Sequence, residues 1–227
     1  MVYITGDTHG EQGRFFQLSE AGEATWTEED ILIVCGDFGF IYADSAEERI
    51  FLNELEKKPY TICFCDGNHE NFPAIYSYPC EQWNGGKIHR IRKNVLHLMR
   101  GQIFTIDGQR FFTMGGAYSR DKEMRIEGRS WWREELPNGE EYREAIANLE
   151  KCGKSVDYVI THTAPKELIL RMGRYPDPHD AQLTGFFDWI LYEIEYKQWF
   201  FGHWHTDAQQ DQNHRALWFD VVRLGET

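Results

Sequence analysis

Short apolar segments that end abruptly at polar turns are the feature that most constrains the fold of this chain. Each segment is shorter than a typical core helix, and glycine, aspartate or histidine follows it within two residues. Runs of this length and composition predict buried β-strands. We expect such strands at residues 2–4, 31–35, 60–65, 156–160 and 199–201.

Segments with helical periodicity separate the first of these strands. We expect helices at residues 12–21, 45–58, 140–151 and 180–196, and the second of them stops before Pro59. Strands that alternate with helices favour a mostly parallel sheet buried on both faces. The sequence therefore predicts an α/β fold.

A run of strands without intervening helices follows the first third of the chain. We expect strands at residues 87–91, 95–99, 102–106 and 110–114, with a hairpin turn at Asp107 and Gly108. This run suggests a second, more antiparallel sheet. Residues 207–212 and 216–222 suggest a closing hairpin.

The polar residues gather directly after the predicted strands. In open α/β sheets, ligands bind beyond the carboxyl ends of the strands, so these residues are candidates for one site. The motifs are residues 6–10 (Gly-Asp-Thr-His-Gly), 36–39 (Gly-Asp-Phe-Gly), 67–70 (Gly-Asn-His-Glu), 161–165 (Thr-His-Thr-Ala-Pro) and 202–205 (Gly-His-Trp-His).

Taken singly, each motif also fits an ordinary turn, because glycine, aspartate and asparagine all favour turns. His203 and His205 give the strongest single signal, since alternate residues of an extended segment point to one side. Together the motifs offer carboxylate, imidazole and amide donors, which suit a pair of divalent cations. Two adjacent cations repel and need a shared anion between them. We read the glycines as turns that also let a phosphate approach the backbone.

These five motifs, in this order, resemble the calcineurin-like metallophosphoesterase superfamily. The resemblance extends from Gly6 to His205, and the joint pattern is specific. It implies a four-layer sandwich of two mixed β-sheets flanked by helices, with a dimetal site at the carboxyl ends of the strands. It also implies hydrolysis of phosphate esters by attack of a hydroxide that bridges two divalent ions. The ions would be Mn, Fe, Zn or Mg, with Mn or an Fe/Zn pair favoured.

The resemblance assigns the roles of the family's residues to the residues at the matching motif positions of this chain. One ion would be bound by Asp7, His9 and His205, and the second by Asn68, His162 and His203. Asp37 would bridge the two ions. The catalytic set would be Asp37, Asn68 and His69, with His69 near the leaving group as a proton donor or a phosphate ligand.

Two departures from the family pattern affect these expectations. Many members carry an aspartate three residues after the bridging one, where it orients the catalytic histidine, and this chain has Phe40 there. Another group, Asp66 or Glu70, is then expected to support His69. The protein-phosphatase branch also carries arginines beside its second and third motifs. This chain has none in those stretches, so a phosphoprotein substrate is less expected.

A basic and aromatic segment follows the fourth strand of the helix-free run. We expect it to be an insert or cap near residues 117–138 of one domain that spans residues 1–227. Arg125, Arg129 and Trp131 are candidates for substrate contacts, because arginine grips phosphate and tryptophan stacks on rings. The alternative is a solvated loop whose tryptophans pack on the core.

Composition limits the partners of the chain. The formal net charge of −13 over 227 residues opposes binding of nucleic acid and of acidic membranes. No apolar run reaches the length of a membrane span and no signal peptide is visible, so we expect a cytoplasmic protein. The odd count of 5 cysteines predicts reduced thiols. The oligomeric state stays open.

The expected function is hydrolysis of phosphodiesters or phosphomonoesters of small, nucleotide-like molecules. Three alternatives stay open at this point. Two are other enzymes of the same superfamily, a nuclease and a protein phosphatase. The third is a scaffold that binds metal without catalysis, although the complete donor set argues against it.

Overall fold

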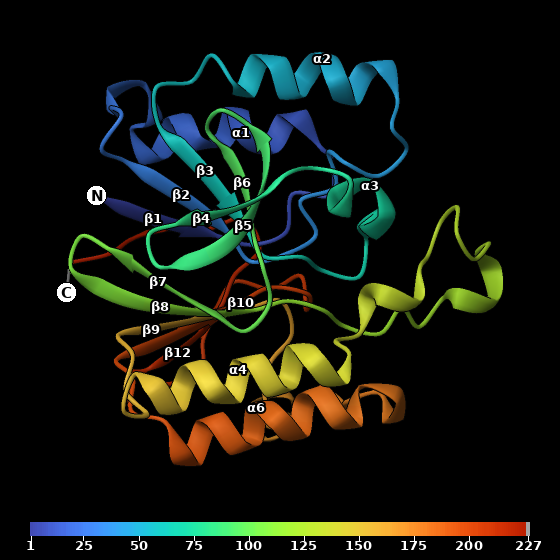
Figure 1. The fold of residues 1–227 in the computed structure, drawn as a ribbon, viewed down its shortest axis with the longest axis vertical. Helices are drawn as coiled ribbons and strands as arrows, with labels where there is room; N and C mark the ends of the chain where they lie inside the picture. Colours follow the sequence, from blue (N-terminus) through green and yellow to red (C-terminus); the bar gives the residue numbers. More distant parts are fainter. Residues whose placement is uncertain (226–227) are drawn as a thin grey trace.

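Two mixed β-sheets lie face to face, and helices cover the outer face of each sheet (Figure 1). The structure is a computed structural model that describes residues 1–225. Helices α1 and α2 cover one sheet, and α4 and α6 cover the other. This four-layer α/β sandwich confirms the predicted fold class. No helix within residues 1–225 has both the length and the apolar character needed to cross a membrane.

The first sheet contains seven strands in the order β13-β1-β2-β3-β6-β5-β4. Its centre is parallel, since β1, β2, β3 and β6 pair in parallel, whereas β13, β5 and β4 pair antiparallel to their neighbours. The bounds are β1 Val2–Thr5, β2 Ile31–Val34, β3 Thr61–Phe64, β4 Cys80–Trp83, β5 Gly86–Arg92, β6 Val95–Leu98 and β13 Val221–Arg223.

The second sheet contains six strands in the order β11-β12-β10-β9-β8-β7. Its central strands β8, β9, β10 and β12 are parallel, and the edge strands β7 and β11 are antiparallel. The bounds are β7 Gln102–Ile106, β8 Gln109–Met114, β9 Tyr158–Thr161, β10 Gln198–Phe201, β11 Ala208–Gln209 and β12 His214–Ala216.

Three hydrophobic cores hold the layers together, one between the two sheets and one between each sheet and its helices. In β1, Ile4 packs between the two sheets, whereas Tyr3 faces the core under α1 and α2. Val159 of β9 faces the third core, under α4, α5 and α6. Both faces of the central strands are therefore buried, which explains their continuous apolar sequence. The helices are α1 Gln12–Gln17, α2 Ala46–Leu55, α3 Phe72–Tyr76, α4 Gly139–Lys151, α5 Lys166–Arg171 and α6 Ala181–Glu193.

Short 3₁₀ helices and capping boxes complete the helical layers. Ser45 caps α2 in a capping box with Glu48, and Asn138 caps α4 in one with Glu141. Each box satisfies backbone N–H groups that would otherwise lack partners in the first turn. The 3₁₀ helices are Leu18–Ala21, Glu23–Thr25, Lys122–Met124, Arg133–Glu135 and Pro178–Asp180.

The predicted run of strands does not form a second sheet of its own. β6 pairs in parallel with β3, and β5 and β4 extend the first sheet, whereas β7 and β8 belong to the second sheet. The chain changes sheets at Gly101, which has a φ of +71° and would place a Cβ 2.8 Å from Ala145 of α4. Apolar patterning identifies strands but not their partners, so the prediction was wrong on this point.

The predicted closing hairpin is also only half correct. β11 and β12 form an antiparallel pair, but residues beyond Ala216 leave it, and β13 joins β1 in the first sheet. The Asp207 carboxylate accepts hydrogen bonds from the backbone N–H groups of Trp218, Phe219 and Asp220. This contact holds the crossover between the sheets.

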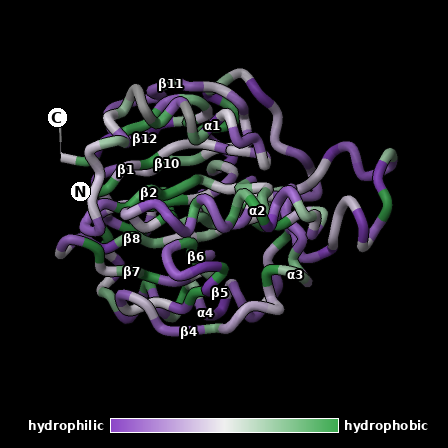
Figure 2. The backbone as a smooth tube through the Cα atoms, turned by 90° about the horizontal axis from the view of Figure 1, so that it is seen from above, coloured by the Kyte–Doolittle hydropathy of each residue, from purple (hydrophilic) through white to green (hydrophobic). Residues whose placement is uncertain are grey.

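Residues 117–138 extend from the body of the sandwich beside α3 and α4 (Figure 1). Figure 2 shows that this segment is largely hydrophilic with a short hydrophobic stretch. Met124 and Ile126 are exposed there by 84% and 60%. Trp132, by contrast, is buried and packs its ring against Tyr42, so the segment is anchored to the body at that point.

Candidate metal centre

All five motifs directly follow a strand, and their loops meet where the two sheets face each other. β1, β2 and β3 are adjacent parallel strands of the first sheet, and β9 and β10 are adjacent parallel strands of the second. Parallel strands end at the same edge, so their loops converge. Backbone contacts join the two groups of loops, since the N–H of His203 donates to Asp7 Oδ1 at 3.0 Å.

Asp7, His9 and His205 form the first group of donors. One ligand atom from each of these residues lies within 4.8 Å of the others. His9 Nε2 and His205 Nε2 lie 2.8 Å apart, and Asp7 Oδ2 is 3.3 Å from His205 Nε2. The structure thus brings together the three residues expected to bind one ion.

The second group of donors is centred on His162, which is fully buried. His162 Nε2 lies 3.4 Å from Asp37 Oδ2 and 3.0 Å from Asn68 Oδ1, and its ring meets that of His203 edge to face. Asp7, Asp37 and His162 offer ligand atoms within 4.8 Å of one another. The residues expected at the second ion therefore also lie together.

Asp37 and Asp7 both lie between the two groups of donors. Asp37 Oδ2 is 3.8 Å from His9 Nδ1 and 3.4 Å from His162 Nε2, so it faces a histidine of each group. Asp7 has ligand atoms in both groups. Both carboxylates are therefore candidates for the bridge between two ions. The geometry does not single out Asp37, which we expected to bridge them alone.

The glycines of three motifs make room for a donor of another motif. A Cβ on Gly67 would lie 2.0 Å from Asp37 Oδ1, and one on Gly202 would lie 2.0 Å from Asp7 Oδ1. A Cβ on Gly36 would lie 2.2 Å from His162 Nδ1. The space is thus occupied by carboxylate and imidazole groups. Our sequence-based explanation, in which phosphate approaches these glycines, was wrong for these three positions.

Four of the predicted ligands have left-handed backbone conformations. The φ angles are +48° at His9, +47° at Asp37, +66° at His203 and +46° at His205. Non-glycine residues with positive φ are uncommon and concentrate at functional sites, where the surrounding structure holds them. This concentration of strain in three loops supports a functional role for the donor set.

Burial and the histidine rings together set the charges of the donors. Burial raises the pKa of Asp7, but hydrogen bonds from His205 and His9 more than offset it, and the pKa falls below its usual range. Burial also opposes ionisation of Asp37, yet the charge of His162 keeps this pKa well below its usual range. Despite its own burial, His162 has a pKa raised to about 10 by Asp37 and Asp7.

His203 behaves in the opposite way. Burial, followed by repulsion from His162, lowers the pKa of His203 to about 3. A histidine must be neutral to ligate a metal ion, so ions bound here would take the place of the proton that His162 holds. Buried carboxylates paired with imidazoles and one amide fit the ligand preferences of Mn, Fe and Zn.

His69 lies beside the donor groups and contacts an arginine. Its backbone N–H donates to Asp37 Oδ1 at 2.7 Å, and its ring nitrogens lie 3.1 and 3.3 Å from the guanidinium nitrogens of Arg125. Burial lowers the pKa of His69, and repulsion from Arg125 lowers it further. The attraction of Asp37 raises this pKa but does not offset the other two effects. The sequence did not predict this arginine contact, because 56 positions separate the two residues.

Neither carboxylate that we expected to support His69 is directed at its ring. Asp66 accepts hydrogen bonds from His97 and Arg100, and Glu70 accepts them from the backbone N–H groups of Phe38 and Gly39. Phe40 packs in the aromatic core under α1 and α2. The expectation that Asp66 or Glu70 takes over the role of the missing aspartate therefore has no support in these contacts.

Asn68 is held by a chain of buried polar groups from residues 117–138. Its Nδ2 donates to Ser119 Oγ at 3.0 Å, and the N–H of Ser119 donates to Glu135 Oε1 at 3.1 Å. Glu135 is fully buried and pairs with Lys122. The amide of Asn68 is thereby oriented with Oδ1 toward His162. This support could not be found from sequence, since serine and glutamate carry no distinctive motif here.

A cavity of about 340 Å³ opens onto the donor groups. Among the predicted site residues, Asp37, Asn68, His69, His203, His205 and Arg125 line it. Arg120, Arg174 and Trp204 also line it, and of these only Arg120 lies in the predicted segment. Arg129 is exposed and Trp131 packs against Lys122, so neither is part of this lining.

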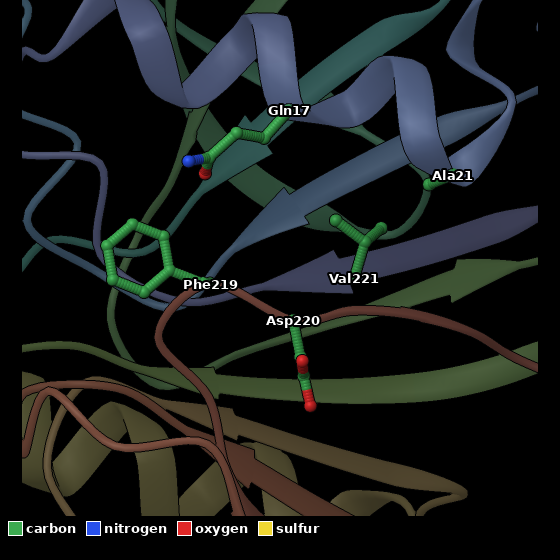
Figure 3. A pocket seen from close by; sticks show the side chains of 5 residues that line it. All are labelled: Gln17, Ala21, Phe219, Asp220 and Val221. Carbon is green, nitrogen blue, oxygen red and sulfur yellow. The ribbon is translucent and has the colours of Figure 1, made fainter.

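A second cavity, of about 390 Å³, lies between α1 and β13 (Figure 3). Gln17, Ala21, Phe219, Asp220 and Val221 line it. It contains a single carboxylate, from Asp220, and none of the predicted metal ligands. This cavity therefore does not compete with the cavity at the strand ends as a metal centre.

Comparison with known proteins agrees with this geometry. The family model for calcineurin-like phosphoesterases matches residues 1–207 of the 227-residue chain, a range that contains all five motifs. Comparison with curated proteins gave no match. The family is dimetal-dependent and acts on phosphate esters. The match covers most of the chain, so the protein belongs to the calcineurin-like phosphoesterases.

Proposed function

We propose that this protein hydrolyses phosphodiesters or phosphomonoesters of small, nucleotide-like molecules with two divalent metal ions. The observation that supports this proposal is the convergence of donors from five strand ends beside one open cavity. Mn, or an Fe/Zn pair, is favoured because the set mixes carboxylates with several imidazoles.

In this proposal the donors divide into two sets. Asp7, His9 and His205 would hold one ion, and Asn68, His162 and His203 would hold the other. Asp37 lies between the two sets and would be shared by both ions. When bound, two such ions lower the pKa of water towards neutrality and offset the negative charge of the phosphate group.

The other polar residues then act on the substrate. His69 faces the cavity and is placed to donate a proton to the leaving oxygen, a role in which histidine is the commonest residue. Its pKa is lowered by burial, so a phosphate anion bound beside it would favour the protonated form that this role requires. Arg125 contacts the His69 ring and offers guanidinium N–H donors to the phosphate oxygens. The body of the sandwich excludes water from the inner side of the donor groups.

The substrate class follows from what surrounds the cavity. The stretches beside the second and third motifs lack the arginines of protein phosphatases, which disfavours phosphoproteins. Residues 117–138 act as a cap that contributes Arg120 and Arg125 to the cavity. The formal net charge of −13 disfavours long nucleic acids, since their affinity depends on phosphate contacts with basic surfaces.

Metal dependence and substrate class are tested together. We expect the chelated protein to be inactive and Mn²⁺ to restore hydrolysis. Bis(p-nitrophenyl) phosphate, p-nitrophenyl phosphate, a phosphopeptide and a short DNA duplex form the substrate panel, and a small ester should give the highest kcat/KM. A phosphopeptide as the best substrate would refute the substrate class. Bound metal without turnover of any ester would favour the scaffold alternative.

The role of Ser119 gives a second prediction. In Ser119→Ala, the Asn68 amide loses the acceptor of its Nδ2 group, so its carbonyl is no longer oriented. Groups that orient metal ligands are worth about 10- to 100-fold in metal affinity. We expect the affinity for one of two Mn²⁺ ions to fall by about this factor in calorimetric titrations.

Two variants control for other effects at this position. Ser119→Thr keeps the hydroxyl and should retain the affinity of the wild-type protein. Ser130→Ala removes a hydroxyl from the same segment, but Ser130 Oγ accepts only from the backbone N–H of Ile126. Unchanged affinity at both ions in Ser119→Ala would show that Asn68 needs no support, or that it is not a ligand.

A further inference from the structure

The cavity at the metal centre carries a concentration of arginines that the proposed hydrolysis does not by itself require. Arg120, Arg125 and Arg174 all line it, although acidic residues outnumber basic ones by 37 to 24 in the chain. Arg125 contacts His69 and therefore belongs to the reacting end. Arg120 and Arg174 line the same cavity, but the arginine in contact with His69 is Arg125. These two residues are therefore candidates for a site separate from the reacting end.

Arg174 supplies a guanidinium group without a protein partner. It follows α5, and its backbone N–H donates to Ile169 O at 3.1 Å. Its side chain is exposed and lines the cavity, and within residues 1–225 it makes no hydrogen bond or ion pair. Arg171, one turn earlier, instead pairs with Glu167 and Asp211. Arg174 is thus free to bind an anion in the cavity.

Arg120 is fixed beside the loop that carries Arg174. Its guanidinium group donates to the carbonyl oxygen of Tyr175, and its Nε lies 3.5 Å from Asp177 Oδ2. These contacts join residues 117–138 to the loop after α5. Arg120 therefore contacts the residue that directly follows Arg174 in the sequence.

An indole ring separates Arg120 from the metal ligands. The guanidinium carbon of Arg120 lies 5.7 Å from the centre of the Trp204 ring, and the Trp204 ring lies 5.1 Å from the His203 ring, edge to face. A phosphate group held at the donor groups does not extend across an indole. An anion at Arg120 and Arg174 would therefore be a different group from the phosphate held at the donor groups, and the shared cavity allows both groups to belong to one ligand.

We propose that Arg120 and Arg174 form a subsite for a second phosphate group of the substrate. The preferred substrates are then phosphate esters with a further phosphate on the leaving or retained part, such as nucleoside bisphosphates. Guanidinium groups bind phosphate in a bidentate manner, and a phosphate carries about −1.5 to −2 charges at neutral pH. Arg174 supplies a guanidinium group that is free within residues 1–225, and Arg120 adds N–H donors beside it while also facing Asp177. This inference rests on the proposed function.

A pair of ligands that differ only in the second phosphate tests the subsite. Calorimetric titration of the full chain, loaded with Mn²⁺, uses thymidine monophosphate and thymidine bisphosphate as probes. We expect the bisphosphate to bind about 10- to 100-fold more tightly, as charge-assisted hydrogen bonds predict. Arg174→Ala should remove most of this advantage and leave binding of the monophosphate unchanged.

Arg171→Ala is the matched control, because it removes the same charge from the same helix end but outside the cavity. It should keep the preference for the bisphosphate. Equal affinity of the wild-type protein for both probes would overturn the subsite, as would an equal loss for both probes in Arg174→Ala. A preference as strong as that of the wild type in Arg174→Ala would also overturn it.

Hydrolysis of the p-nitrophenyl esters of both nucleotides separates this inference from the proposed function. Turnover of both esters with equal KM values would refute the subsite and leave the hydrolase intact. Preferential binding of the bisphosphate without turnover of either ester would refute the hydrolase and support the subsite.

Discussion

Asp37→Asn is expected to lower both metal occupancy and activity more than any other single substitution in the protein. Only an anion offsets the repulsion of two adjacent cations, and the amide carries no charge. The amide oxygen can still accept from the His69 N–H, as Asp37 Oδ1 does at 2.7 Å, so the fold should be retained. We expect metal affinity and kcat each to fall by about 100-fold or more, since even groups that only orient ligands are worth about 10- to 100-fold.

Elemental analysis and calorimetric titration with Mn²⁺ measure the occupancy. Asp157→Asn is a matched control, because Asp157 precedes β9 at the opposite end from His162 and accepts from the Arg110 N–H. Near-normal activity with two bound ions in Asp37→Asn would reject the bridging role. If Asp7→Asn has the larger effect, the bridge is Asp7, which has ligand atoms in both donor groups.

His69→Ala is expected to retain both ions and to lose activity. A general acid contributes about 10²–10⁴-fold in rate, so kcat should fall by that range for esters with poor leaving groups. Esters of nitrophenol need little protonation and should lose much less. The measurement is kcat for alkyl and nitrophenyl esters of the same phosphate, with metal content determined on the same samples.

Each alternative role of His69 gives a different result. An equal loss for good and poor leaving groups would show that His69 binds the phosphate group and does not donate a proton. Loss of one ion would show that His69 is a ligand, although its ring lies outside both donor groups in the structure. Unchanged kinetics for every ester would show that His69 takes no part in the reaction.

The central strands and their polar ends were predictable because each signal is local. An apolar run of three to six residues that ends at a polar, mostly glycine-containing turn indicates both a buried strand and its loop. The parallel pairing of β1, β2 and β3 then places Asp7, Asp37 and Asn68 at one edge. Predicted ligands from the second sheet, His162 and His203, join them for the same reason.

The errors and omissions concern short elements and contacts between distant parts of the chain. β4, α3 and α5 are short and lack clear periodicity, so they were not predicted. The partners of β6, β7 and β13 depend on tertiary packing. The same holds for Arg125 beside His69 and for Arg174, which comes from a loop with no recognisable motif. Composition suggested a basic segment but not which of its arginines faces the cavity.

The crossing of the chain between the two sheets also determines when the metal centre can form. The contact between His203 and Asp7 joins residues 196 positions apart, and contacts of such separation form late because the loop that they close is entropically costly. The chain up to β6 carries Asp7, His9, Asp37 and Asn68, but the remaining histidines follow β9 and β10. With the proposed ligands, complete coordination of two ions would require both sheets, so we expect metal stoichiometry to report whether folding has finished.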